Sequence, residues 1–124
     1  MSIMTRGIRG ATTSTANTRE AILEATTEML ERLVEANDLD KERIAAALFT
    51  TTRDLNADFP AVAARLLGWT EVALMCSHEM NVPGALPSCI RVMVLVNTDK
   101  QPGEIVNVYL RDAVNLRNRG TDDR

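Results

Sequence analysis

The chain has 124 residues, with 14 basic and 17 acidic side chains and a formal net charge of −3. This length suits one domain with a single modest core. The basic residues are scattered and no apolar run approaches the roughly 18 residues of a membrane span, so neither nucleic acid nor a membrane is an expected partner. We expect a cytoplasmic protein in which Cys76 and Cys89 are free thiols.

The first third of the chain predicts a strand followed by a long helix. Residues 3–13 are rich in glycine and β-branched residues, and alternation places Arg9 on the face opposite its apolar neighbours. Apolar residues then recur at helical spacing. This spacing predicts a helix over about 18–36, with Asn17 as its N-cap and Asn37 as the left-handed residue at its end.

The middle of the chain predicts a second strand and a second helix. Residues 44–52 form an apolar, threonine-rich run whose length favours a strand, although its alanines leave a helix open. Asp58 is the expected N-cap of a short helix that ends at Gly68. A brief apolar run at 72–75 is expected to be a third, short strand, and glycine and prolines predict a loop at 81–87.

The last third predicts two more strands. Residues 90–96 carry the strongest strand pattern, apolar on both faces except at Arg91, and residues 106–111 form the last strand. The single domain covers residues 1–117, and residues 118–124 form a flexible tail. The element order predicts an α+β fold, a ferredoxin-like mixed sheet with helices on one face. Its other face is too apolar to remain wet, so we expect another subunit to cover it.

Arginines stand where strands should be apolar. Arg9 and Arg91 lie inside the two best strand patterns, and Tyr109 and Arg111 lie in a third. Burial of a guanidinium costs on the order of several kcal/mol unless an anion meets it. Each arginine alone could emerge at a sheet edge or pair with an acidic side chain. Two of them together favour a site in which the planar guanidinium binds a carboxylate bidentately.

Six segments resemble the AroH-class chorismate mutases, in the same order and with similar spacing. They are residues 6–13 (ArgGlyIleArgGlyAlaThrThr), 54–61, 68–69, 76–80, 89–93 and 108–117. The resemblance implies a cofactor-free isomerase that converts chorismate to prephenate in phenylalanine and tyrosine biosynthesis. It also implies a homotrimer whose sheets join into a pseudo β-barrel core, with active sites between the subunits.

The resemblance also implies roles for individual residues. Arg9 falls on the arginine that binds a substrate carboxylate, and Tyr109 on the tyrosine that bonds the other carboxylate. Arg91 falls on the cation beside the breaking ether bond, and Glu79 on the glutamate near the ring hydroxyl, with Cys76 as its neighbour in the pocket. The other substrate-binding positions are a wall from the adjacent subunit, two residues of the pocket lining and a mobile covering segment: Phe59, Ala61, Arg65, Met75, Cys76, Leu116 and Arg117.

The residues themselves leave several alternatives open. Glu79 could be a salt-bridge partner of a strand arginine, Cys76 and Met75 could be packing residues, and His78 is expected to be solvated in a loop outside the site. Where the family pattern usually has a lysine, this chain has Val62, so we expect weaker steering of the substrate. The sequence has no Ser/His/Asp set, phosphate loop or Cys/His metal spacing, so neither cofactor nor metal is expected. A trimeric enamine/imine deaminase and a non-catalytic aromatic-metabolite-binding module are the two alternative functions.

Overall fold

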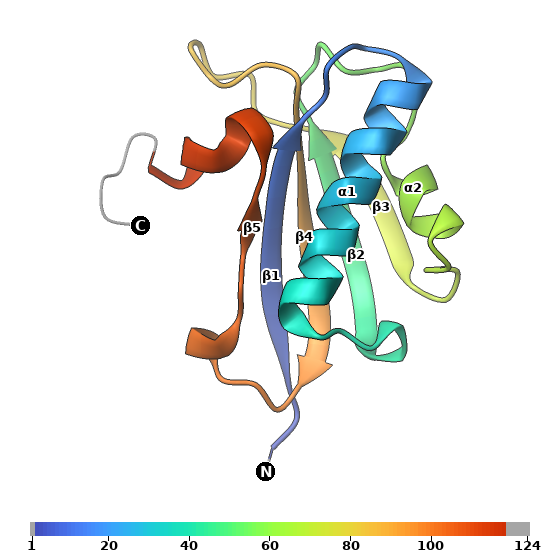
Figure 1. Ribbon diagram of the computed structural model, residues 1–124, viewed down its shortest axis with the longest axis vertical. Coiled ribbons are helices and arrows are strands. Elements are labelled where there is room, and N and C mark those ends of the chain that lie inside the picture. The colour runs from blue at the N-terminus through green and yellow to red at the C-terminus, as the bar shows by residue number, and fades with distance from the viewer. Residues whose placement is uncertain (1, 119–124) are drawn as a thin grey trace.

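The computed structural model describes residues 2–118, which form a five-stranded mixed sheet with its helices on one face (Figure 1). The elements are β1 (Met4–Thr13), α1 (Arg19–Asn37), η1 (Lys41–Arg43), β2 (Ile44–Thr51), α2 (Ala61–Leu66), β3 (Ala73–His78), β4 (Cys89–Thr98), η2 (Pro102–Glu104), β5 (Val108–Tyr109) and η3 (Arg111–Asn118). The strand order is β3-β2-β4-β1-β5, with β4 antiparallel to both of its neighbours and the two outer pairs parallel. The expected α+β class, mixed sheet and one-sided helices are confirmed.

The core lies between α1 and the sheet. The apolar stripe of α1, which includes Met29 and Leu33, is fully buried, as are the helix-facing residues of β4. The helix approaches β1 closely at Gly10, where an added Cβ would lie 3.2 Å from the Leu33 side chain and 3.1 Å from Val92. Glycine at this position therefore allows the helix to sit directly over the centre of the sheet.

Both predicted N-caps differ in detail from the structure. The side chain of Thr18, not Asn17, accepts the backbone N–H that caps α1. Asn17 instead accepts two backbone N–H groups of the loop before α2. Asp58 lies before Pro60, the residue from which α2 begins, and its carboxylate pairs with Arg19 at 3.0 Å. A neighbouring threonine thus caps α1, α2 begins at Pro60 without a side-chain cap, and both predicted residues connect the loop before α2 to the start of α1.

The ends of the two helices show one confirmed prediction and one error. Gly68 has a φ of 93° and follows the last turn of α2, as predicted. At the end of α1, Asp38 adopts the left-handed conformation and Asn37 is the last helical residue. The buried Asn37 side chain is committed elsewhere: its Nδ2 donates to Leu33 O and Val106 O, and its Oδ1 accepts from Val106 N. It thus fastens the end of α1 to the chain that leads into β5.

The predicted strand bounds are wrong in two places. The third strand continues to His78, because β3 pairs over its whole length with residues 46–51 of β2. The last strand contains only residues 108–109, because Val106 bonds to Asn37 and Arg111 turns away with a φ of 54°. The tail predicted at 118–124 lies, apart from the backbone of residue 118, outside the described residues.

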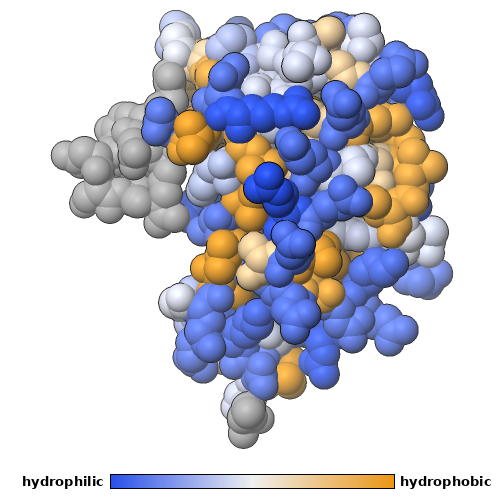
Figure 2. Space-filling model, in the orientation of Figure 1, coloured by the Kyte–Doolittle hydropathy of each residue, from blue (hydrophilic) through white to orange (hydrophobic). Residues whose placement is uncertain are grey.

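The face of the sheet opposite the helices has no cover within the protomer. Leu48 pairs in register with Met75 on one side and Met93 on the other, and these side chains are 40%, 64% and 37% exposed. Figure 2 shows the opposite, helix-bearing face, which is largely hydrophilic over α1, with apolar surface gathered near α2. The predicted uncovered apolar face is present. Within residues 2–118, no helix is both long and apolar enough to cross a membrane.

Candidate active site

Strand register brings the predicted cationic residues together on the open face. Ala11 of β1 pairs with Arg91 of β4 on one side and with Tyr109 of β5 on the other. Arg9 lies two residues earlier on β1, so its side chain projects from the same face. Thr50 of β2 lies directly opposite Arg91 on the other edge of β4. Four adjacent strands therefore contribute one side chain each to a single patch.

These side chains line a hollow of about 220 Å³. Its lining residues are Arg9, Gly10, Leu48, Thr50, Glu79, Arg91, Val92, Met93 and Tyr109. Neither the Arg9 nor the Arg91 guanidinium donates a hydrogen bond to any of the described residues, so both remain available to an anion. Two cations and a phenol on apolar strands form a site for a small molecule with more than one acidic group.

Glu79 is the acidic member of the patch. Its backbone N–H bonds to Thr51 O at 2.8 Å, which fixes the chain as it leaves β3. Its Oε2 accepts a hydrogen bond of 2.5 Å from Thr50 Oγ1 and lies 3.5 Å from Arg91 Nη1. The salt-bridge alternative for Glu79 is therefore present as an ionic contact, in a position that also lines the hollow.

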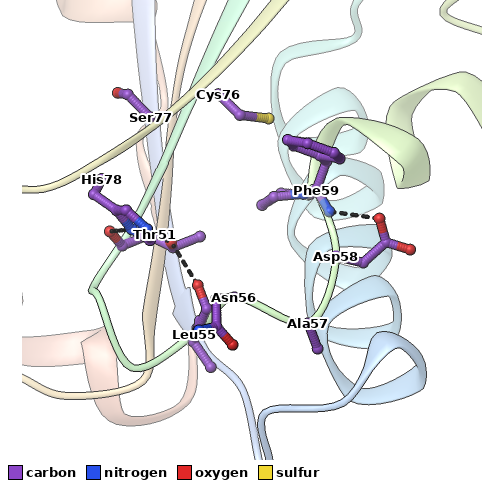
Figure 3. Close-up of a pocket in the computed structure, with 10 residues that line it drawn as sticks. Thr51, Leu55, Asn56, Ala57, Asp58, Phe59, Cys76, Ser77 and His78 are labelled. Carbon is purple, nitrogen blue, oxygen red and sulfur yellow. Dashed lines mark hydrogen bonds between the residues drawn. The ribbon is translucent and has the colours of Figure 1, made fainter.

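A second hollow, of about 340 Å³, lies on the helix side at the end of β2 and β3 (Figure 3). The ring of Phe59 and the thiol of Cys76 face each other across it. Burial raises the pKa of the Cys76 thiol, against smaller opposing effects of a hydrogen bond to the Ala61 backbone and of the Arg65 charge. Phe59 and Cys76 line this hollow, and Ala61 and Arg65 lie near the Cys76 thiol; the resemblance places Phe59, Ala61 and Arg65, but not Cys76, in the wall from the adjacent subunit.

Within one protomer this wall and the cationic patch do not meet. Cys76 and Glu79 are three residues apart along an extended chain, so their side chains leave opposite faces of the sheet. The prediction that Cys76 neighbours Glu79 in one pocket therefore requires two protomers. Met75 is on the open face of the edge strand, beside Leu48, and does not pack into the core.

The C-terminal segment approaches the patch from the side. Leu116 of η3 lines a further hollow, of about 470 Å³, together with Glu79 and Arg91. This is where the sequence predicted a covering segment. The backbone of Arg117 continues η3, but its side chain lies outside what the structure describes.

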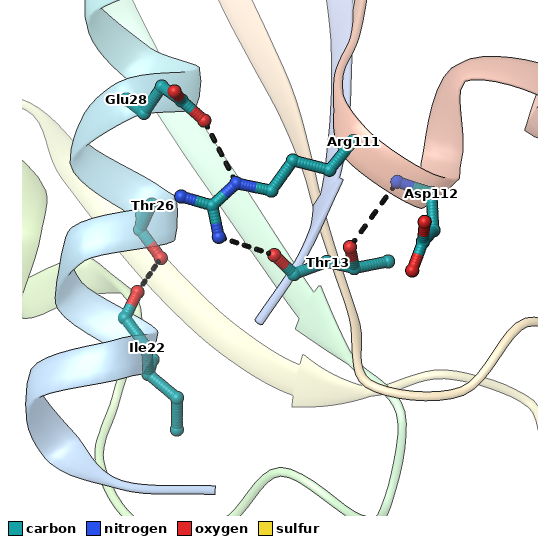
Figure 4. Close-up of polar contacts among 6 residues, drawn as sticks. All are labelled: Thr13, Ile22, Thr26, Glu28, Arg111 and Asp112. Atoms are coloured by element: carbon teal, nitrogen blue, oxygen red, sulfur yellow. Dashed lines mark hydrogen bonds and ion pairs between the residues drawn. The ribbon is translucent and has the colours of Figure 1, made fainter. Parts of the chain in front are cut away.

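Arg111, which the sequence assigned to a strand, anchors this segment (Figure 4). Its Nε bonds to Glu28 of α1 at 3.1 Å, and its Nη1 donates to Thr13 O at 3.0 Å. The next N–H, of Asp112, reaches Thr13 Oγ1, and Ala113 is fully buried. Because two of its guanidinium nitrogens are engaged within the protomer and it does not line the hollow of the patch, Arg111 is a structural clamp.

Two further residues lie outside the cationic patch: His78 lines the second hollow, and Cys89 lines the hollow that contains Leu116. His78 is exposed as predicted, but it ends β3 and does not lie in a loop, and its Nδ1 lies 3.2 Å from Thr51 Oγ1. Cys89 is buried, and burial raises the pKa of its thiol to about 11, so it stays protonated near neutral pH. Both cysteines are free. Residues 2–118 contain no cluster of His, Cys, Asp and Glu that could hold a metal ion.

The hollow on the open face thus brings two arginines and a phenol together, a lining that suits a small acid. A family model described as chorismate mutase type I matches residues 5–119, and the chain belongs to this family.

Known relatives are similar to this chain in sequence over nearly its whole length. A chorismate mutase AroH of Thermus thermophilus is 50% identical over 115 residues, which are 92% of this chain and 94% of that protein. A chorismate mutase AroH of Bacillus subtilis is 47% identical over 116 residues, 93% of this chain and 91% of the relative. The solved structure of a chorismate mutase from Clostridium thermocellum superimposes with a TM-score of 0.86 at 50% identity, covering 87% of this chain and 96% of that one.

Proposed function

We propose that this protein isomerises chorismate to prephenate, at sites formed where the open face of one protomer meets the Phe59 wall of another. The observation that carries the proposal is the alignment of Arg9, Arg91 and Tyr109 on one face, with both guanidinium groups free of hydrogen bonds within the described residues. Chorismate carries two carboxylates, which a pair of arginines and a phenol can hold in a fixed orientation.

The reaction is a unimolecular rearrangement in which one carbon–oxygen bond breaks as one carbon–carbon bond forms. It needs no nucleophile and no proton transfer, so the protein contributes orientation and electrostatic stabilisation. Arg9 and Tyr109 hold the carboxylates and select the compact conformer. Arg91 donates to the ether oxygen, where negative charge develops as the bond breaks, and Glu79 contacts the ring hydroxyl. Leu116 and Arg117 cover the bound substrate.

We further propose that the active assembly is a homotrimer. Phe59 and Leu66 are 64% and 72% exposed in the protomer, and the open sheet face carries Leu48 and Met93. Exposed apolar surface on both partners supports an interface between copies of the chain. In that assembly Ala61, Arg65 and Cys76 complete the pocket from the neighbouring subunit, and we expect the protein to act in the cytoplasm. Val62 places an apolar side chain beside this wall, so substrate steering is weaker than with a lysine there.

Arg91 provides the decisive test. Replacement of Arg91 by its neutral isostere citrulline should lower kcat by about a hundred- to a thousandfold with a much smaller change in KM, the cost of one preorganised donor of roughly 2.7–4 kcal/mol. Turnover is followed by loss of the diene absorbance of chorismate, without added cofactor. Arg32→Ala, which removes an exposed arginine of α1, is the control and should leave kcat unchanged.

Four outcomes would contradict the proposal. Full kcat in a folded citrulline variant would refute the role of Arg91. Absence of chorismate turnover by the wild-type protein, with turnover of an imino acid, would identify a deaminase, and binding without turnover would identify a sensor module. A protein that is fully active as a monomer would refute the shared site.

A further inference from the structure

Thr50 lies in the cationic patch, and neither the strand pattern nor the family resemblance singled it out. It pairs with Arg91 across the antiparallel β2–β4 ladder and with Ser77 across the parallel β2–β3 ladder. Directly opposed residues on neighbouring strands project from the same face, so the Thr50 hydroxyl lies beside the Arg91 guanidinium. It lines the same hollow.

The contacts of Glu79 are unequal. Thr50 Oγ1 donates to Glu79 Oε2 at 2.5 Å, whereas Arg91 Nη1 lies 3.5 Å from that same oxygen. A hydrogen bond between a guanidinium and a carboxylate is about 2.7–2.9 Å long. The carboxylate is therefore hydrogen-bonded to the hydroxyl and is only in ionic contact with Arg91.

This inequality matters because an arginine and a carboxylate within reach of each other favour a close bidentate pair. Such a pair would occupy the N–H groups of Arg91 that must face the charge developing on the substrate. The Arg91 and Glu79 side chains are 44% and 27% exposed, so both have room to move. The hydroxyl of Thr50, held on β2 between β3 and β4, instead binds the oxygen that Arg91 would otherwise take.

We propose that Thr50 is a positioning residue that holds the Glu79 carboxylate back from Arg91, leaving the guanidinium available to the transition state. This inference rests on the function proposed above. It assigns Thr50 an effect on the chemical step, because Arg91 matters most when charge develops on the ether oxygen. An effect on substrate affinity alone is not expected.

Thr50→Val removes the hydroxyl and keeps the shape of the side chain, and Thr50→Ser keeps the hydroxyl. We expect Thr50→Val to lower kcat by about tenfold or more with KM within about twofold, and Thr50→Ser to stay close to wild type. Thr5→Val is the matched control, since Thr5 is another strand threonine whose hydroxyl bonds to a side chain, Asn97 Oδ1, at 2.7 Å. It should leave both constants unchanged.

Two measurements separate positioning from a merely structural role. In a Glu79→Ala background, Thr50→Val should cause no further loss of kcat, because the carboxylate to be held back is gone. A crystal structure of Thr50→Val should show Glu79 and Arg91 in direct hydrogen bonds of about 2.7–2.9 Å. An unchanged kcat, an undiminished loss in the Glu79→Ala background, or an unchanged Glu79–Arg91 separation would overturn the inference. Failure of the wild-type protein to turn over chorismate would instead overturn the proposed function, and the crystallographic measurement would still test the contact.

Discussion

Replacement of Asn37 by leucine tests the fastening between α1 and the chain that enters β5. Asn37 is fully buried, and leucine has the same branched outline and a greater preference for burial. If apolar burial dominated at this position, Asn37→Leu would stabilise the protein. We expect the opposite, because the amide makes three hydrogen bonds, and both its donor and its acceptor reach Val106.

The size of the effect follows from the groups left behind. Asn37→Leu leaves the backbone N–H and C=O of Val106 without hydrogen-bond partners. Both groups are partly buried and belong to no β-ladder. A buried backbone group without a hydrogen-bond partner lowers the free energy of unfolding by about 1–3 kcal/mol. The loss is reduced here because water reaches part of this site and because burial of the leucine side chain is favourable. A net loss of about 2–3 kcal/mol is expected, which corresponds to a fall of roughly 6–12 °C in Tm for a domain of this size.

Thermal unfolding followed by circular dichroism measures this change, at one fixed protomer concentration because assembly contributes to apparent stability. Asn81→Ala, a change in the exposed loop after β3, is the control and should move Tm by little. A Tm for Asn37→Leu equal to or above the wild-type value would refute the conclusion that the hydrogen bonds of the Asn37 amide stabilise the fold. It would mean that apolar burial outweighs the three bonds.

Three other changes test separate parts of the molecule. Thr12→Val should raise Tm by a few degrees, because the fully buried Thr12 hydroxyl lacks a hydrogen-bond partner within the described residues, at a cost of about 1–3 kcal/mol. Glu28→Ala should raise KM by about two- to fivefold with kcat nearly unchanged, because it loosens the clamp on Arg111 that places Leu116. Asp54→Asn should flatten the acid limb of stability against pH in chemical denaturation. The pKa of Asp54 is held below its usual 3.8, chiefly by the hydrogen bond from a threonine hydroxyl, so its stabilisation is complete above that value and is lost as the pH falls through the lower, folded-state pKa.

For each of these three predictions, one result would contradict it. A lower Tm for Thr12→Val would mean that its hydroxyl has a partner in the assembled protein. Glu24→Ala, one turn earlier on the same exposed side of α1, is the control for Glu28→Ala, and equal KM changes would show a general charge effect. Parallel pH profiles for Asp54→Asn and the wild type would remove Asp54 from the acid transition.

Patterns within short stretches of sequence predicted the helices and strands that such patterns define. Alternation in β1 and β4 identified which side of each strand Arg9 and Arg91 occupy, because the two-residue period of a strand is present in the sequence itself. The order of elements predicted the open sheet face. The side chains of Arg9, Arg91 and Tyr109 meet because of register, which the sequence alone does not contain; the family resemblance placed them together.

Long-range side-chain bonds account for the errors. The strand expected at 106–111 is short because a buried amide from the end of α1 takes the bonds of Val106, and because Arg111 reaches back to Glu28. Both partners are more than 60 residues away in sequence, so no local window includes them. The sequence does not point to Thr50, because a threonine in a strand is ordinary and only its position opposite Arg91 gives it a role.

The place of β1 in the sheet bears on how the chain reaches its fold. This first strand to be synthesised lies between β4 and β5, so its partners are residues 89–98 and 108–109. While the chain is still growing, both edges of β1 are therefore unpaired. Neither edge can pair until residues 89–98 or 108–109 have been synthesised. Pairings between such distant segments slow folding and leave strand edges open to other chains. We expect α1 and the β2–β3 pair to form first, and the cationic patch to be completed only as the C-terminal residues arrive.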